Sequence, residues 1–365
     1  MPGSKFVPRA GTASRPGIPG TAGLNFGPAI AEAFYQGIPL IVCTADRPPE
    51  WIGQQDGQTI KQHRLYGEHV KEFFNVQTDG SESPAWVANR MMNEAILLCS
   101  DGTPGPVHLN FPFAEPLYPS ADKKITFGNP RVIHNSATYY QLQQKFLSSI
   151  KSKFSRYKRI LIVAGQYKNS PVLSSKLKSF IKNQNLVCIA EITSNLNNQI
   201  PVIRHADVFL QVANENIIRD LKPDLIISFG NGLISKSLKK FLRNSAPNAH
   251  WHIQESGSVP DTFMSLTQII RARPEDFIEL LSKSSTGSTI LNIRNAFFKH
   301  WISHEKRTIN ILSKSFRSDS EGSFVRRLLT RIPDSHGLHL ANSLSVRYAN
   351  LFGLEKSKSS VFVFS

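Results

Sequence analysis

The sequence predicts an α/β protein built from doubly wound parallel sheets. Short apolar runs of strand length alternate with segments in which apolar residues recur at helical spacing. This alternation is typical of parallel strands joined by crossover helices. The chain has 365 residues, which predicts two domains or two and a half, at about 100–200 residues each.

The first β/α unit is expected over residues 20–118. A helix over Asn25–Gln36 carries its apolar residues on one face and should end at Gly37. The continuous apolar run Ile38–Thr44 indicates a strand buried on both faces of a parallel sheet. Later elements are a strand at Val70–Val76, a helix at Pro84–Cys99 and a strand at Pro106–Asn110. Prolines in the segment Phe111–Tyr118 exclude a further central strand and close the unit.

A polar linker at residues 119–136 leads to a central α/β domain over residues 137–285. Its first helix is predicted at Ala137–Lys153 and its first strand at Arg159–Gly165. The remaining strands are predicted at Leu186–Ala190, Asp224–Phe229 and His250–Ile253, and the remaining helices at Val172–Lys182, Ser235–Leu242 and Pro274–Leu281. Strands that alternate with helices again give a parallel sheet covered on both faces.

Residues 286–365 begin a third unit, after a linker rich in serine and glycine at Lys283–Ser288. Its predicted elements are helices at Leu291–Phe316 and Glu321–Arg331, a strand at Gly337–Ala341, a helix from Ser343 and a strand at Val361–Phe364. A parallel sheet buries both faces, so a unit with only these strands is expected to be incomplete. Residues 1–19 are rich in glycine and proline and lack acidic residues, and we expect them to be irregular or the product of a wrong start.

The composition excludes several classes of protein. The net charge is +16, but the lysines are scattered over helix faces and form no basic run, so no nucleic-acid partner is expected. The cysteines Cys43, Cys99 and Cys188 are far apart, which excludes a disulfide framework and favours a reducing compartment. No apolar run approaches the ~20 residues of a membrane helix, so no membrane partner is predicted.

Two patterns in the central domain admit a functional and a structural interpretation. Phe229–Gly232 lies between a strand and a helix, as a dinucleotide-binding turn does, but Ser235 stands where the third glycine belongs. A tight turn is the preferred interpretation. His250 and His252 share a face of their strand and could bind a metal, yet only Glu255 stands near them as a further ligand. The preferred interpretation is that both histidines belong to the core and flank a buried tryptophan, Trp251.

Polar loops follow the first predicted strand at its carboxyl end, where open α/β sheets bind ligands. Prolines fix the segment Asp46–Glu50. Within it Arg47 offers a planar fork for a carboxylate, or pairs structurally with Glu50 or Asp56. The amides of the loop at residues 53–62 both donate and accept hydrogen bonds, which suits a heteroaromatic cofactor or a substrate oxyanion as well as solvent.

Ser343 is expected to cap the helix that follows the strand Gly337–Ala341, so the free N–H groups of that helix can attract an anion. Arg347 lies about one turn further on the same face and can bind the anion bidentately. A capped helix with an exposed arginine is the structural alternative.

Five segments together resemble the MenD family, the 2-succinyl-5-enolpyruvyl-6-hydroxy-3-cyclohexene-1-carboxylate synthases of menaquinone biosynthesis. They are Gly20–Ala33, Thr44–Glu50, Gly57–Gln62, Phe111–Leu117 and Asn342–Arg347, in the order of the family. The strings Thr193–Leu196, Phe229–Gly230 and His250–Ile253 support the resemblance, which extends from Gly20 to Ser365. It implies a thiamine-diphosphate-dependent transferase with pyrimidine-binding, central and pyrophosphate-binding α/β domains, of which the first and last are incomplete here.

The resemblance also implies the chemistry. Thiamine diphosphate, held with Mg²⁺, would decarboxylate 2-oxoglutarate, and the succinyl carbanion equivalent would add to isochorismate in a 1,4 sense. Position by position, Gln58 would act catalytically beside the cofactor and the substrate, and Asn25 would approach the aminopyrimidine. Ser343 and Arg347 would hold a substrate carboxylate, and Lys236 would reach the site from the central domain.

Two features of the family have no counterpart in the sequence. They are the cofactor-activating glutamate and the Gly-Asp-Gly…Asn motif that binds Mg²⁺, so no metal ligand is assigned. We therefore expect a chain truncated at both ends and, for the chain by itself, favour a catalytically inactive fragment over an active synthase. A relative of acetolactate synthase is a further alternative. The resemblance also implies a cytoplasmic enzyme that is a homodimer or homotetramer when complete.

Overall fold

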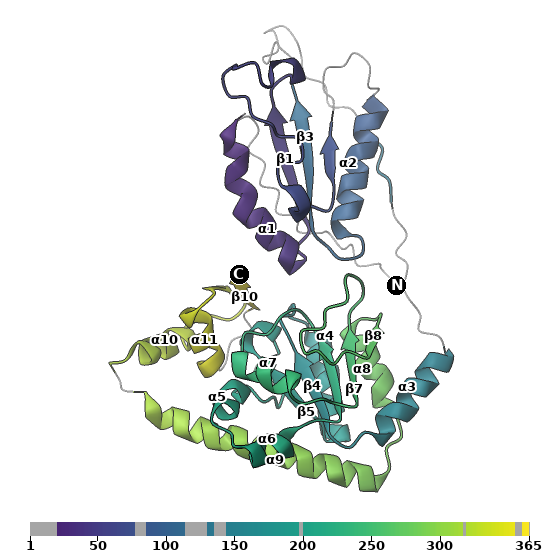
Figure 1. Cartoon of the computed structure of the whole chain (residues 1–365), viewed down its shortest axis with the longest axis vertical. Coiled ribbons are helices and arrows are strands. Elements are labelled where there is room, and N and C mark those ends of the chain that lie inside the picture. The colour runs from purple at the N-terminus through teal and green to yellow at the C-terminus, as the bar shows by residue number, and fades with distance from the viewer. Residues whose placement is uncertain are drawn as a thin grey trace. The chain divides into compact units, whose positions relative to one another are not determined.

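The computed structural model describes residues 20–76, 85–113, 130–134, 144–196, 200–316, 319–354 and 360–364. These residues form an α/β fold whose three sheets contain parallel strands, as predicted (Figure 1). The chain divides into two compact units, residues 1–138 and 139–365. The segment predicted to be irregular, residues 1–19, and most of the linker at 119–136 lie outside the described residues.

The first unit is built on three strands in the order β1–β3–β2. They span Leu40–Asp46 (β1), Phe73–Asn75 (β2) and Pro106–Pro112 (β3). A 3-10 helix at Thr21–Phe26 leads into α1, Gly27–Gln36, which ends at Gly37 in the left-handed conformation, as expected. α2, Ala85–Ser100, packs against β3.

The prediction that the first strand is buried on both faces is wrong. Burial alternates along β1, where Val42 and Thr44 are buried while Ile41 and Cys43 are only half-buried. The reason is its place in the sheet. β1 is an edge strand among the described residues, and the buried side chains of α2 cluster with those of β3 and β2.

The second unit contains a doubly wound sheet in the order β5–β4–β6–β7–β8. Its strands are β4 Ile160–Ala164, β5 Val187–Ala190, β6 Leu225–Phe229, β7 Ala249–Ile253 and β8 Gln268–Ile270. One face packs against α3 Gln144–Arg156, α4 Pro171–Gln184 and α8 Pro274–Ser282. The other packs against α5 Ala206–Gln211, α6 Glu215–Leu221, α7 Lys236–Arg243 and α9 Ser288–Ser315 (Figure 1). The sequence did not predict α5, α6 or β8, which are short.

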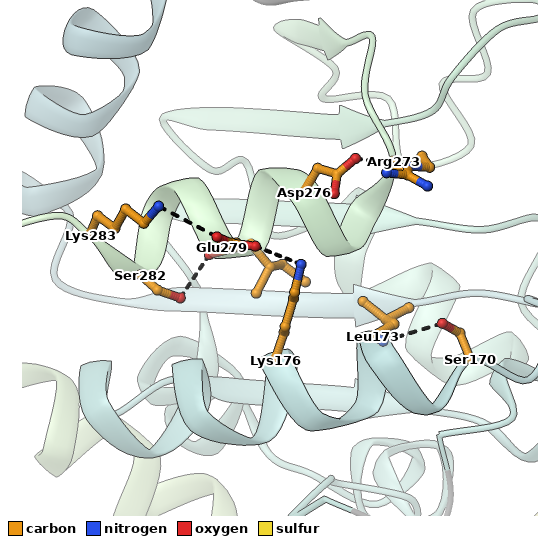
Figure 2. A network of polar contacts seen from close by, with 9 residues as sticks. Ser170, Leu173, Lys176, Arg273, Asp276, Glu279, Ser282 and Lys283 are labelled. Atoms are coloured by element: carbon orange, nitrogen blue, oxygen red, sulfur yellow. Dashed lines mark hydrogen bonds and ion pairs between the residues drawn. The ribbon is translucent and has the colours of Figure 1, made fainter. Parts of the chain in front are cut away.

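α4 and α8 lie side by side on one face of this sheet. Figure 2 shows Glu279 of α8 between Lys176 of α4, at 2.6 Å, and Lys283, at 3.4 Å. These ion pairs are exposed and contribute little to stability. The start of α4 is fixed by a cap, since the hydroxyl of Ser170 accepts from the N–H of Leu173 at 3.2 Å (Figure 2).

The last elements pack within the second unit. They are α9, α10 Glu321–Leu329, β9 Gly337–Ala341, α11 Leu344–Phe352 and β10 Ser360–Phe364. β9 pairs with β10 in parallel, and Ile192 of the central domain lies in the same apolar cluster as Val346 and Val361. The central and third predicted domains therefore share one compact unit, and a boundary near residue 285 stays a prediction.

Candidate functional site

Buried polar side chains meet at the carboxyl end of β1 and β3 in the first unit. The carboxylate of Asp46 accepts hydrogen bonds from the side-chain amides of Gln62, at 3.0 Å, and Asn110, at 2.9 Å. Asn110 also accepts from the hydroxyl of Thr44, which pairs with His108, each at 2.7 Å. All five side chains are buried. Asp46 thus ties the loop that carries Gln62 to the end of the sheet.

Gly20 brings the turn that carries Asn25 against the loop that carries Gln58. Gly20 has a φ of 90°, and a Cβ atom there would contact the backbone of Gln58 at 3.4 Å. The hydroxyl of Tyr66 donates to the carbonyl of Gly23 at 2.8 Å and fastens the same turn to the following loop. Gln58 itself has a φ of 61°. The side chains of Asn25 and Gln58 are both exposed on these two packed elements.

Arg47 pairs with Asp56, one of the two carboxylates expected as structural partners. Its Nη2 lies 3.1 Å from Oδ2 of Asp56, and its side chain is 18% exposed. The hydroxyl of Thr59 donates to the carbonyl of Asp56 at 2.8 Å. The arginine therefore helps to hold the loop of Gln58 in place. Recognition of a ligand by Arg47 stays a prediction.

In the second unit a buried carboxylate holds the start of the helix that carries Lys236. Glu191 follows β5, is 1% exposed, and accepts from the backbone N–H groups of Ile234, at 2.5 Å, and Ser235, at 2.7 Å. These N–H groups precede α7 and would otherwise lack partners. Burial raises the pKa of Glu191, and the hydrogen bonds from Ser235 and Ile234 oppose that shift.

Lys236 is the first residue of α7, and its side chain is exposed. A second carboxylate, that of Asp207, accepts from the N–H of Ser237 at 2.7 Å. Carboxylates of the chain thus accept from three N–H groups at or just before the start of α7, those of Ile234, Ser235 and Ser237. An anion near this helix would also meet the ammonium group of Lys236.

Ser343 and Arg347 are exposed on the segment that opens α11. Ser343 occupies the N-cap position of α11, as predicted, but its side chain makes no capping hydrogen bond. Ser343 has a φ of 86°, whereas a capping side chain needs the extended backbone, and Asn342 Oδ1 instead accepts from the N–H of Ser343 at 2.8 Å. Such a φ costs a residue other than glycine about 1–3 kcal/mol, and strain of this kind is concentrated at functional sites.

The two residues that follow β5, Glu191 and Ile192, anchor both α7 and α11. Glu191 binds the start of α7, and the N–H of Ile192 donates to the side chain of Asn350 on α11 at 2.8 Å. Lys236 and Arg347 therefore lie on helices that are fixed to adjacent residues. Asn25 and Gln58 belong to the other unit.

The turn Phe229–Gly232 is a packing feature, as the tight-turn interpretation expects. A Cβ atom on Gly165 would lie 1.9 Å from the carbonyl oxygen of Asn231. A Cβ atom on Gly230, which has a φ of 80°, would lie 2.7 Å from the carbonyl oxygen of Gln166. The switch point of the sheet lies between β4 and β6, where open α/β sheets bind ligands. Here the backbone of the turn after β4, at Gly165 and Gln166, and that of the turn after β6, at Gly230 and Asn231, fill the switch point. This packing excludes a dinucleotide between the two turns.

His250 and His252 are buried in the core, in agreement with the structural interpretation preferred from the sequence. Both rings contact the hydroxyl of Ser228, at 2.6 Å and 2.8 Å, and Trp251 between them is 3% exposed. Burial lowers the pKa of each histidine to about 4, so both are neutral at pH 7. Across the part of the chain that the structure describes, His, Cys, Asp and Glu form no group of three or more that could hold a metal.

The buried groups that were not predicted from the sequence include Glu191, His205 and Glu305. A signal existed for Glu305. Together with Trp301 and Thr308 it recurs at helical spacing along the buried side of α9, where an acidic residue needs a partner. No local pattern marks Glu191 or His205. Among the described residues, no helix combines the length and the apolar character needed to cross a membrane.

Comparison with known proteins gives consistent results. Residues 133–339 match the family model described as the middle domain of thiamine pyrophosphate enzymes. The chain is similar to proteins named 2-succinyl-5-enolpyruvyl-6-hydroxy-3-cyclohexene-1-carboxylate synthase. That of Cytophaga hutchinsonii is 39% identical over 351 residues, covering 94% of this chain and 60% of the relative. That of Porphyromonas gingivalis is 36% identical over 340 residues, covering 91% and 58%. The chain thus spans about three fifths of the length of the curated relatives it matches.

Proposed function

Since the chain belongs to the 2-succinyl-5-enolpyruvyl-6-hydroxy-3-cyclohexene-1-carboxylate synthase family of thiamine pyrophosphate enzymes, we propose that it forms part of the wall of a thiamine-diphosphate site. In the proposed reaction of menaquinone biosynthesis, 2-oxoglutarate loses CO2 and its succinyl group is joined to isochorismate by 1,4-addition. The cofactor, when bound, supplies the carbanion chemistry. The residues of the chain bind, orient and neutralise the reactants.

The contact between Gly20 and Gln58 carries this proposal. It packs the turn of Asn25 against the loop of Gln58, and both side-chain amides are exposed there. An amide donates and accepts hydrogen bonds, which is the polarity that a substituted pyrimidine ring needs. We assign cofactor binding to Asn25 and Gln58, and orientation of the substrate beside the cofactor to Gln58.

Both proposed substrates are anions, and the second unit offers suitable groups. Arg347 is exposed and carries a planar fork that matches a carboxylate, while Lys236 offers a point charge. The strained backbone of Ser343 at the start of α11 supports a role for this segment in binding. We assign substrate binding to Ser343, Arg347 and Lys236.

We propose Mg²⁺ as the companion of the cofactor and assign it no ligand, because no suitable cluster occurs among the described residues. We also propose a cytoplasmic protein that acts as a homodimer or homotetramer. The free thiols of Cys43, Cys99 and Cys188 support a reducing compartment.

Calorimetric titration of the purified chain with thiamine diphosphate and Mg²⁺ tests the proposal. We expect saturable binding that Gln58→Asn weakens roughly tenfold, because the shorter amide no longer reaches the ligand. Gln55→Asn is the matched control, since Gln55 lies in the same loop with the same left-handed backbone and an exposed side chain. Asparagine tolerates that backbone, so neither change strains the loop.

Other results of these experiments would favour one of the two alternative functions. Absence of binding would establish the catalytically inactive fragment. Binding followed by use of pyruvate instead of 2-oxoglutarate would favour the relative of acetolactate synthase. In an active preparation Arg347→Lys should raise the KM for 2-oxoglutarate about tenfold, because lysine keeps the charge and loses the fork. Arg331→Lys, at an exposed arginine outside the proposed site, should leave the KM unchanged.

A further inference from the structure

His205 contacts two helices, α9 and α11, at residues that lie 100 and 146 positions further along the chain. Its Nδ1 lies 2.7 Å from Oε1 of Glu305 on α9, and its Nε2 lies 2.8 Å from the carbonyl oxygen of Leu351 in the last turn of α11. The side chains of His205 and Glu305 are only 8% and 7% exposed. The ring is therefore part of the packed junction between α9 and α11.

Both partners of the ring are hydrogen-bond acceptors. The carboxylate of Glu305 already accepts from the backbone N–H groups of Arg204 and His205, each at 3.1 Å, and the carbonyl of Leu351 has no hydrogen to donate. Since a carbonyl can only accept, the Nε2–H of the ring donates to Leu351, while Nδ1 contacts the carboxylate of Glu305. The ring of His205 thus bridges α9 and the end of α11.

This pair fixes the carboxyl end of α11. Leu351 has one of the carbonyls that a helix end leaves without an internal partner, and the ring of His205 supplies one. Arg204 packs against the next turn so closely that a Cβ atom on Gly353 would overlap its guanidinium group. One turn earlier, Asn350 is held by Ile192. α11 thus has a defined position relative to the central sheet.

We propose that His205 and Glu305 are positioning residues that set the place of α11 and, through it, of Arg347 and Ser343. This proposal rests on the proposed function, in which those two residues bind an anionic substrate. The pair touches no substrate itself. Its contribution is to keep the helix from shifting when a charged ligand enters.

Hydrogen exchange of the amides at residues 348–353 tests the positioning role and needs no substrate. His205→Gln should exchange roughly tenfold faster there. Glu305→Gln should exchange faster by a smaller factor, because its NH2 group must face the backbone N–H of Arg204 or of His205, both of which donate to the carboxylate of Glu305. His300→Gln is the control, since His300 lies on α9 and packs on His304. Unchanged exchange in His205→Gln would refute the positioning role.

Binding of 2-oxoglutarate links the pair to function. In a preparation that binds this ligand, His205→Gln should weaken its binding several-fold and Glu305→Gln should weaken it less. Equal binding by His205→Gln and the unmodified chain would overturn the link to Arg347. Failure of the unmodified chain to bind 2-oxoglutarate would instead count against the proposed function, and the exchange results would still decide whether the pair holds α11.

Discussion

The side chain of Asn195 pairs with the backbone of Val361 as a neighbouring strand would. Its Nδ2 donates to the carbonyl of Val361 at 3.1 Å, and its Oδ1 accepts from the N–H of Val361 at 2.7 Å. Val361 lies in β10, which pairs only with β9 among the described strands. One asparagine therefore holds the edge of the small sheet against the segment that follows β5.

Removal of this side chain should loosen β10. Asn195→Gly is expected to lower the free energy of unfolding by about 1–3 kcal/mol, because the N–H and carbonyl of Val361 lose buried partners. Asn195→Ala should cost about 1 kcal/mol more, since Asn195 has a φ of 57° that alanine adopts poorly. Urea unfolding monitored by circular dichroism measures both. Equal stability of Asn195→Gly and the unmodified chain would contradict this account.

Gly165 should tolerate no side chain. A Cβ atom there would overlap the carbonyl of Asn231 in the facing turn, so Gly165→Ala must displace backbone and should lose about 1–3 kcal/mol or more of stability. Gly232→Ala is the control in the same pair of turns, because nothing lies within 4 Å of its Cβ position. Similar melting temperatures for the two variants would show that the turns are not closely packed.

Ser343→Gly should stabilise the fold and impair binding. Glycine adopts the φ of 86° without strain, which should raise the free energy of unfolding by about 1 kcal/mol. The same change at Ser345, within α11, should lower it by about 0.5–1 kcal/mol. Under the proposed function Ser343→Gly also weakens 2-oxoglutarate binding. Thermal unfolding measures the effect on stability, and a binding titration measures the effect on ligand binding. A Ser343→Gly variant less stable than the unmodified chain would show that the backbone at Ser343 is not strained.

Acid should destabilise the protein through its buried histidines. Burial lowers the pKa of His108, His250 and His252 from an ordinary value of 6.5 to about 4. The folded chain then binds fewer protons than the unfolded chain between these values, so stability is complete above pH 6.5 and falls as the pH drops toward 4. Each histidine contributes a slope of up to about 1.4 kcal/mol per pH unit.

The His252→Asn variant tests this pH dependence. Its amide can replace the contact of Nδ1 with Ser228 but cannot titrate, so denaturant unfolding at several pH values between 7 and 4.5 should show a shallower slope. A slope equal to that of the unmodified chain would mean that His252 is not a source of the acid sensitivity.

The sequence alone predicted most of the regular elements. Apolar periodicity located β4, β6, β9 and α8 to within one or two residues, and Gly37 ended α1 as its lack of a side chain allows. These features depend on residues close together in the chain, so a local pattern is enough to reveal them. The short elements α5 and β8 lack such a pattern, because contacts from elsewhere stabilise them.

Only the tertiary structure decided how the candidate site is held. Glu191, His205 and Asn195 each bind backbone groups that lie 43 to 166 residues away, and no local sequence pattern predicts those partners. The strain at Ser343 is equally invisible in the sequence, which predicted a helix cap there. The sequence determines which segments are strands, which are helices and which are polar loops that can bind a ligand. A buried polar group must be paired, and its partner is fixed only when distant parts of the chain pack together.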